Sequence, residues 1–175
     1  MRPLTDFSAG MQQHGVVAGG AMVGVLAGAI LGARRGFGAV ALLLVLVAVG
    51  LPLLAGGRGG LGVFFTPSVG FLLGWPLAAY VIGWLTERGG STYRLPWGIV
   101  ANIVGGILVL YAAGIAGIAA VAGISVWAAT VSTWIFIPGD LVKAVLAAVI
   151  ARGVHAAYPG LISARRTRSK ETAAV

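Results

Sequence analysis

The chain has 175 residues, of which 59% are hydrophobic and only 9% are charged, and its mean hydropathy is +1.00. A soluble domain of this length must face water with its whole exterior, so this composition excludes one. Several segments reach the roughly 20 apolar residues that span a bilayer. Cysteine is absent, which excludes disulfides, thiolate metal sites and a cysteine nucleophile. We therefore expect an all-α polytopic membrane protein.

Five apolar segments are predicted to be transmembrane helices, and each is bounded by basic residues, prolines or glycine-rich turns. In chain order they cover residues 14–33, 37–54, 68–85, 96–116 and 138–158. A further segment, Gly117–Ile137, is apolar but rich in Gly, Ala, Ser and Thr, and it is ambiguous between a span and a surface element. A cleaved signal peptide is a competing interpretation of the first segment. Residues 1–160 are predicted to form a single helical membrane domain, and residues 161–175 a basic polar cytoplasmic tail.

The net charge of +8 is better explained by membrane topology than by nucleic-acid binding, because the basic residues lie at segment ends. If Gly117–Ile137 does not span, Arg2 and Arg58 fall on one side of the membrane and Lys143 is buried within it. The remaining nine basic residues fall on the other side of the membrane: Arg34, Arg35, Arg88, Arg94, Arg152, Arg165, Arg166, Arg168 and Lys170. The positive-inside rule then predicts an outside N-terminus and a cytoplasmic C-terminus. We expect the membrane to be the plasma (inner) membrane.

The most informative residues are Asp140 and Lys143, a carboxylate and an amine within the last apolar segment. Pro138 and Gly139 are predicted to start the helix, because proline fits a first turn. Residues three apart share a helix face, so both charges should point the same way. A charge at membrane depth costs roughly 2.5–3.5 kcal/mol. The two residues therefore form either a structural ion pair or a polar pocket for a small ligand.

The remaining polar features are fewer. Asn102 is a buried amide that either bridges helices or joins Asp140 and Lys143 in a site. No phosphate loop, metal-ligand spacing or nucleophile–base pair is present, so we expect no catalytic residue, no metal and no cofactor. Small residues at four-residue spacing along the first segment indicate close helix packing, within the chain or with another subunit. They are Gly20, Gly24, Gly28 and Gly32.

Two stretches, Thr66–Tyr80 and Phe136–Ala144, resemble segments of the BioY family, the biotin-specific substrate-binding components of energy-coupling factor transporters. Thr66–Tyr80 is similar to that family's Gly-Pro-Thr-x-Gly-Tyr-Leu-x-Gly-Phe-Pro segment. Phe136–Ala144 contains Pro-Gly-Asp-Leu-Val-Lys and resembles the family's Pro-Gly-Asp-x-x-Lys segment, its most specific element. Residues 26–36 and the Gly50-Leu51-Pro52 sequence also fit. The resemblance runs from about Val25 to the end of the last predicted helix.

The sequence departs from the family pattern at three places. Thr66 and Ser68 replace the usual Gly and Thr, so Ser68 keeps a hydroxyl while Thr66 loses the backbone freedom of glycine. Residues 16–33 match the family's second helix, which implies a six-helix fold lacking its first helix. The family's Pro-x-Pro-x-Thr-x-Gln segment has no match in residues 8–17. The family's motif for docking the coupling subunit lies in that first helix.

The resemblance implies a membrane-embedded component that captures biotin from outside, with import driven by a transmembrane coupling subunit and two ATPase subunits. Asp140 would then accept from the ureido N–H groups, and Lys143 would donate to the ureido carbonyl or the carboxylate. Phe71 and Trp75 would form an apolar wall, and Ser68 and Asn102 would add neutral hydrogen bonds. The alternatives are a component for another small vitamin, a structural membrane protein in which the charges merely pair, and an intramembrane enzyme.

Overall fold

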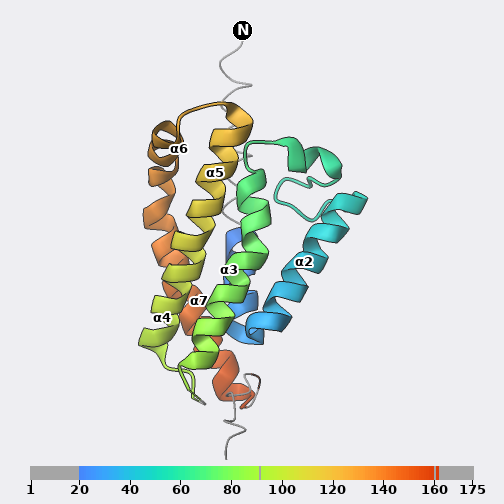
Figure 1. Ribbon diagram of the computed structural model, residues 1–175. Helices are drawn as coiled ribbons and strands as arrows, with labels where there is room; N and C mark the ends of the chain where they lie inside the picture. Colours follow the sequence, from blue (N-terminus) through green and yellow to red (C-terminus); the bar gives the residue numbers. More distant parts are fainter. Residues whose placement is uncertain (1–19, 91, 160, 162–175) are drawn as a thin grey trace, which may run out of the picture.

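The computed structural model describes residues 20–90, 92–159 and 161. Within these ranges the chain is helical except for turns and one isolated bridge between Leu54 and Arg58. The helices run side by side in one elongated bundle (Figure 1). The predicted all-α fold is confirmed.

The elements follow the predicted segments. A helix covers Gly20–Leu31 in the described part, followed by α2 (Ala33–Val49), the 3₁₀ helix η1 (Leu61–Phe65) and α3 (Val69–Arg88). Next, α4 (Leu95–Ile103), the π-helix η2 (Val104–Val109) and α5 (Leu110–Ala122) form one continuous helix. Likewise, α6 (Val126–Thr133), the 3₁₀ turn η3 (Trp134–Phe136) and α7 (Ile137–Ala157) form another. In the described chain, three helices are long and apolar enough to cross a membrane: Val69–Arg88, Leu95–Ala122 and Val126–Ala157.

The ambiguous segment Gly117–Ile137 is the tip of a helical hairpin rather than an element of its own. Its first residues complete α5, and Gly123 turns the chain with φ of 66°, a left-handed conformation that suits glycine. Ser125 then caps α6, since its hydroxyl accepts from the backbone N–H of Ala128 at 3.2 Å. The last long helix therefore begins at Val126 and not at Pro138. Pro138 lacks an N–H donor, and the helix tightens into η3 immediately before it.

The glycine stripe packs inside the chain, which answers whether its neighbour is internal. A Cβ on Gly24 would lie 3.4 Å from the backbone oxygen of Trp75, and one on Gly28 would collide with the backbone of Ala79. The first described helix therefore lies directly against α3. Val25 and Ala29 of the same helix share an apolar cluster with Ile82 of α3 and with two small residues of α7, Ala147 and Ala151. These contacts fix the first described helix between α3 and α7.

The two ends of the bundle differ in charge. Ala33 donates its backbone N–H to Glu87 Oε1 at 2.8 Å, and Trp97 Nε1 donates to the carbonyl of Leu85 at 2.7 Å. These contacts gather the α2 start, the α3 end and the α4 start at one end, which is the lower end in Figure 1. The described basic residues at this end are Arg34, Arg35, Arg88, Arg94 and Arg152. Arg58 pairs with Leu54 in the loop that follows α2, at the opposite end, so this distribution agrees with the charge count.

Candidate functional site

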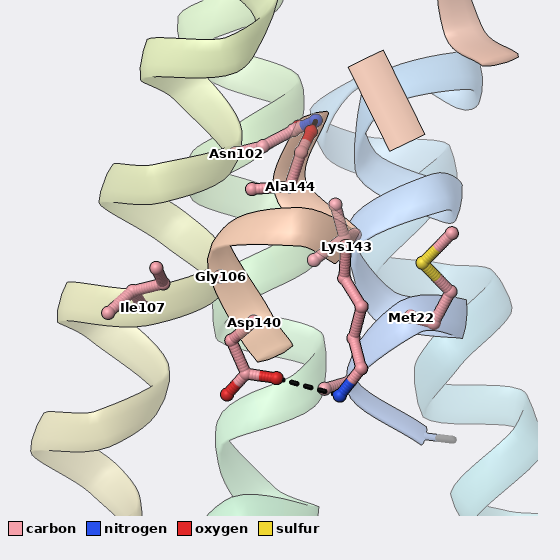
Figure 2. A pocket seen from close by; sticks show the side chains of 9 residues that line it. Met22, Asn102, Gly106, Ile107, Asp140, Lys143 and Ala144 are labelled. Atoms are coloured by element: carbon pink, nitrogen blue, oxygen red, sulfur yellow. Dashed lines mark hydrogen bonds and ion pairs between the residues drawn. The ribbon is translucent and has the colours of Figure 1, made fainter. Parts of the chain in front are cut away.

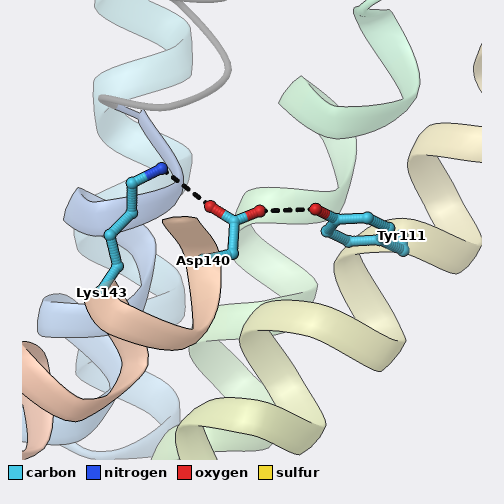
Figure 3. Close-up of polar contacts among 3 residues, drawn as sticks. All are labelled: Tyr111, Asp140 and Lys143. Atoms are coloured by element: carbon cyan, nitrogen blue, oxygen red, sulfur yellow. Dashed lines mark hydrogen bonds and ion pairs between the residues drawn. The ribbon is translucent and has the colours of Figure 1, made fainter. Parts of the chain in front are cut away.

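Asp140 and Lys143 point the same way from α7, as the sequence spacing predicts. Lys143 Nζ donates to Asp140 Oδ1 at 2.8 Å (Figure 3). The Asp140 side chain is 10% exposed and that of Lys143 is 28% exposed, so Lys143 is partly rather than fully buried. Because both residues lie on one helix, this ion pair does not hold two helices together.

Tyr111 supplies the contact between helices. Its hydroxyl donates to Asp140 Oδ2 at 2.7 Å, which joins α5 to α7 (Figure 3). Phe71 of α3 packs edge-on against the Tyr111 ring, with centroids 6.0 Å apart and an interplanar angle of 83°. Both carboxylate oxygens of Asp140 are therefore engaged by charged or polar donors, as a buried carboxylate requires. Sequence analysis did not select Tyr111, although a phenol at membrane depth needs a hydrogen-bond partner.

The side chain of Asn102 is fully buried, and only one of its two polar atoms has a hydrogen-bond partner among the described residues. Its Nδ2 donates to the backbone carbonyl of Ala144 at 2.9 Å, which links α4 to α7. Its Oδ1 is buried and has no partner among the described residues. An unpaired buried acceptor costs about 1–3 kcal/mol. Asn102 thus bridges helices and also offers an acceptor to a ligand N–H, so both of its predicted roles are compatible.

Asp140, Lys143 and Asn102 line one small cavity between three parts of the bundle (Figure 2). The first described helix and η2 complete its wall. The full lining is Ala21, Met22, Val25, Asn102, Gly106, Ile107, Asp140, Lys143 and Ala144. Its volume is about 10 Å³, which is room for roughly one water molecule. The arrangement is a mostly apolar cavity with a few convergent polar groups, the usual form of a small-molecule site.

The π-helix η2 shapes this cavity. Single π turns inside α-helices occur frequently at functional sites, and here η2 carries two of the lining residues, Gly106 and Ile107. A Cβ on Gly106 would lie only 2.8 Å from Val25 Cγ2 of the first described helix. Glycine at this position therefore leaves room for the Val25 side chain to pack against η2 beside the cavity.

The three remaining predicted site residues do not line the cavity. Ser68 Oγ lies 2.9 Å from Thr66 Oγ1, in a hydrogen bond at the start of α3. Phe71 is buried and reaches the site only through Tyr111. Trp75 is also buried, and its Nε1 has no partner among the described residues. Thr66 has φ of −92°, an ordinary extended conformation, so the loss of glycine there imposes no strain.

The fold and this site define a multi-pass helical membrane protein with a polar cavity among its helices. The family model described as "BioY family" matches residues 13–160, and this chain belongs to the BioY family. It is 48% identical over 147 residues to "Biotin transporter BioY" of Rhizobium etli, covering 81% of this chain and 78% of that protein. It is also 48% identical over 153 residues to the Rhodobacter capsulatus protein of the same name, covering 81% and 79%.

A solved structure has the same fold. It is the "S-component for biotin from an ECF-type ABC transporter", with a TM-score of 0.74 and 28% sequence identity. The match covers 78% of this chain and 73% of that one. BioY is a family of transporter components and not of enzymes, so the intramembrane enzyme is set aside.

Proposed function

We propose that this chain is the membrane-embedded biotin-binding component of a vitamin uptake transporter. The observation that carries the proposal is the cavity at which Asp140, Lys143 and Asn102 meet, within a chain of the BioY family. The relatives called biotin transporters and the solved S-component for biotin support biotin as the ligand.

The polar groups of the cavity complement the chemistry of biotin. Its ureido ring carries two N–H donors and one carbonyl acceptor, next to an apolar ring and an aliphatic carboxylate. Asp140 and the unpaired Oδ1 of Asn102 are acceptors for the N–H groups, and a charged acceptor makes such bonds roughly twice as strong as a neutral one. Lys143 donates to the ureido carbonyl or to the carboxylate. Tyr111 holds Asp140 in place from α5.

The cavity has to widen to admit a vitamin. Small-molecule pockets usually measure about 300–1,000 Å³, whereas this one measures about 10 Å³. We propose that the first described helix moves away from η2 and α7 to open the cavity, because Met22 and Val25 of that helix form part of the cavity wall. Phe71 and Trp75 lie in the core next to this wall together with Ala21. We propose that they become the apolar wall of the widened pocket and that Ser68 adds a neutral hydrogen bond.

We further propose that the protein works with a transmembrane coupling subunit and two ATPase subunits. It lies in the lipid of the plasma membrane, and its C-terminus is cytoplasmic. The printed description of the structural relative as part of an ECF-type ABC transporter supports the partners. The concentration of arginines at one end of the bundle supports the orientation.

Binding of labelled biotin to detergent-purified protein tests the proposed function. We expect saturable binding of the labelled biotin. Excess unlabelled biotin should displace it, and excess thiamine should not. Asp140→Asn should weaken biotin binding, while Glu87→Gln serves as the matched acid-to-amide control, because Glu87 accepts from the backbone N–H of Ala33 at the far end of the bundle. If the folded protein binds another vitamin and no biotin, that vitamin replaces biotin as the proposed ligand. If it binds no vitamin, a structural role is favoured.

A further inference from the structure

A second, much larger pocket lies at the basic end of the bundle. It is open to the surface and measures about 540 Å³. Its lining comes from the loop between α3 and α4, the first turn of α4 and the last part of α7: Tyr93, Arg94, Leu95, Pro96, Trp97 and Arg152. Asp140 precedes Arg152 by 12 residues on the same helix, about 18 Å at the helical rise. This pocket is therefore separate from the cavity at Asp140.

Two arginines from different parts of the chain converge on this pocket without a carboxylate partner. In the described part of the chain the one ion pair is that of Lys143 with Asp140, so Arg94 and Arg152 are both unpaired there. No acidic residue lines the pocket. Tyr93 adds no negative charge, because a phenol is neutral near pH 7 and burial raises the pKa of Tyr93 further, to about 12. The pocket is thus cationic and suited to an anion.

The same two helices expose apolar side chains beyond the arginines. On α4, Trp97 is 39% and Val100 47% exposed, and on α7, Val149, three residues before Arg152 on the same helix face, is 51% exposed. Amphipathic tryptophan is typical of the membrane interface. A ligand that fits both features carries a negative headgroup and apolar chains. Basic pockets between helices at such an interface commonly bind anionic lipid headgroups.

We propose that the pocket between Arg94 and Arg152 binds the phosphate headgroup of an anionic phospholipid, whose acyl chains lie against the exposed apolar side chains of α4 and α7. The two guanidinium groups donate to the phosphate oxygens, a geometry that arginine favours over lysine. This site is independent of the biotin-binding site, and neither arginine belongs to that site.

Native mass spectrometry of the purified protein with phosphatidylglycerol or phosphatidylcholine tests the proposal. The parent should retain phosphatidylglycerol and not phosphatidylcholine. Arg94→Gln and Arg152→Gln should each lower its affinity by about fivefold, as expected for one basic residue at a lipid surface. Arg35→Gln is the matched control, because Arg35 is exposed at the same end but outside the pocket. Labelled-biotin binding should be unchanged in all three variants, which verifies that they are folded.

Other outcomes would overturn the proposal. Equal retention of both lipids, or an equal loss in Arg35→Gln, would mean diffuse attraction rather than a site. Glycerol phosphate that displaces the lipid at equal concentration would mean a soluble phosphate site. Variants that keep phosphatidylglycerol but no longer copurify with a coupling subunit would assign the pocket to a protein partner.

Discussion

The hydroxyl of Tyr111 lies 2.7 Å from Oδ2 of Asp140 and donates to it across the interface between α5 and α7. Lys143 holds the other oxygen at 2.8 Å. The carboxylate is therefore fixed from two sides, by a neutral donor on another helix and by a cation on its own. A ligand that displaces Lys143 meets an acceptor whose orientation Tyr111 already sets, and such preorganisation reduces the entropic cost of binding.

Tyr111→Phe should separate this positioning role from the binding contacts. Loss of the hydroxyl removes one hydrogen bond between helices, worth about 1 kcal/mol in a membrane protein, and should weaken biotin binding about fivefold. The dissociation constant from labelled-biotin titration checks this. Tyr80→Phe is the control, because Tyr80 is 43% exposed on α3 and does not line the cavity. Equal affinities in both variants would remove Tyr111 from the site.

Asp140→Asn should weaken biotin binding well beyond any effect on folding. The substitution replaces a charged acceptor by a neutral amide, and a hydrogen bond to a charged group is worth about 1.5–3 kcal/mol. That corresponds to about a ten- to hundredfold loss of affinity. Equilibrium titration with labelled biotin gives the value, and unchanged affinity in a folded variant would reject the assignment of Asp140.

Lys143→Met tests whether the ion pair is structural. We expect Lys143→Met and Asp140→Asn each to weaken biotin binding. In the absence of biotin, the midpoint of thermal unfolding of each variant should stay near that of the parent protein. Biotin at a hundredfold excess over its dissociation constant should stabilise the parent by about 2.7 kcal/mol. A thermal-shift series of the parent, both single variants and the double variant measures this. Early unfolding of the single variants, reversed in the double, would instead favour a structural pair.

The helical segments and the shared face of Asp140 and Lys143 could be predicted because both depend on local sequence. Hydropathy places the spans, and three-residue spacing on a helix fixes a common direction. Asn102 could also be selected, since a buried amide must find partners. Gly117–Ile137 was ambiguous between a span and a surface element because it is apolar but rich in Gly, Ala, Ser and Thr, and in the structure the turn at Gly123 divides it between two helices.

The rest of the site depends on contacts that hydropathy does not encode. Tyr111 lies 29 residues from Asp140 in sequence, so its partner is set by how α5 packs on α7. The apolar wall assigned to Phe71 and Trp75 rested on their spacing of one turn. In the structure, that spacing places both in the core beside the cavity and not in its lining.

The orientation in the membrane can be measured with single cysteines, since the native chain has none. Ile124 lies in the turn between α5 and α6, and Thr92 lies in the loop between α3 and α4. The two test variants are Ile124→Cys and Thr92→Cys. Both positions are exposed and belong to opposite ends of the bundle. A membrane-impermeant maleimide should label position 124 in intact cells and position 92 only after permeabilisation. The reverse pattern would invert the proposed topology, and labelling of both in intact cells would contradict a spanning bundle.

Gly106→Ala should obstruct the cavity without altering any polar group in it. The added methyl group would lie 2.8 Å from Val25 Cγ2, closer than carbon atoms pack, so the Val25 side chain or one of the two helices has to shift. We expect biotin affinity to fall at least tenfold, because the methyl group occupies space at the cavity wall that the ligand needs.

Gly153→Ala on α7 is the matched control, since a Cβ there meets no atom within 4 Å. That variant should bind biotin normally and should be up to about 1 kcal/mol more stable, as alanine favours helix over glycine. Parent-like affinity in Gly106→Ala, with Asp140→Asn still defective, would mean that biotin approaches Asp140 from a side other than the gap between η2 and the first described helix.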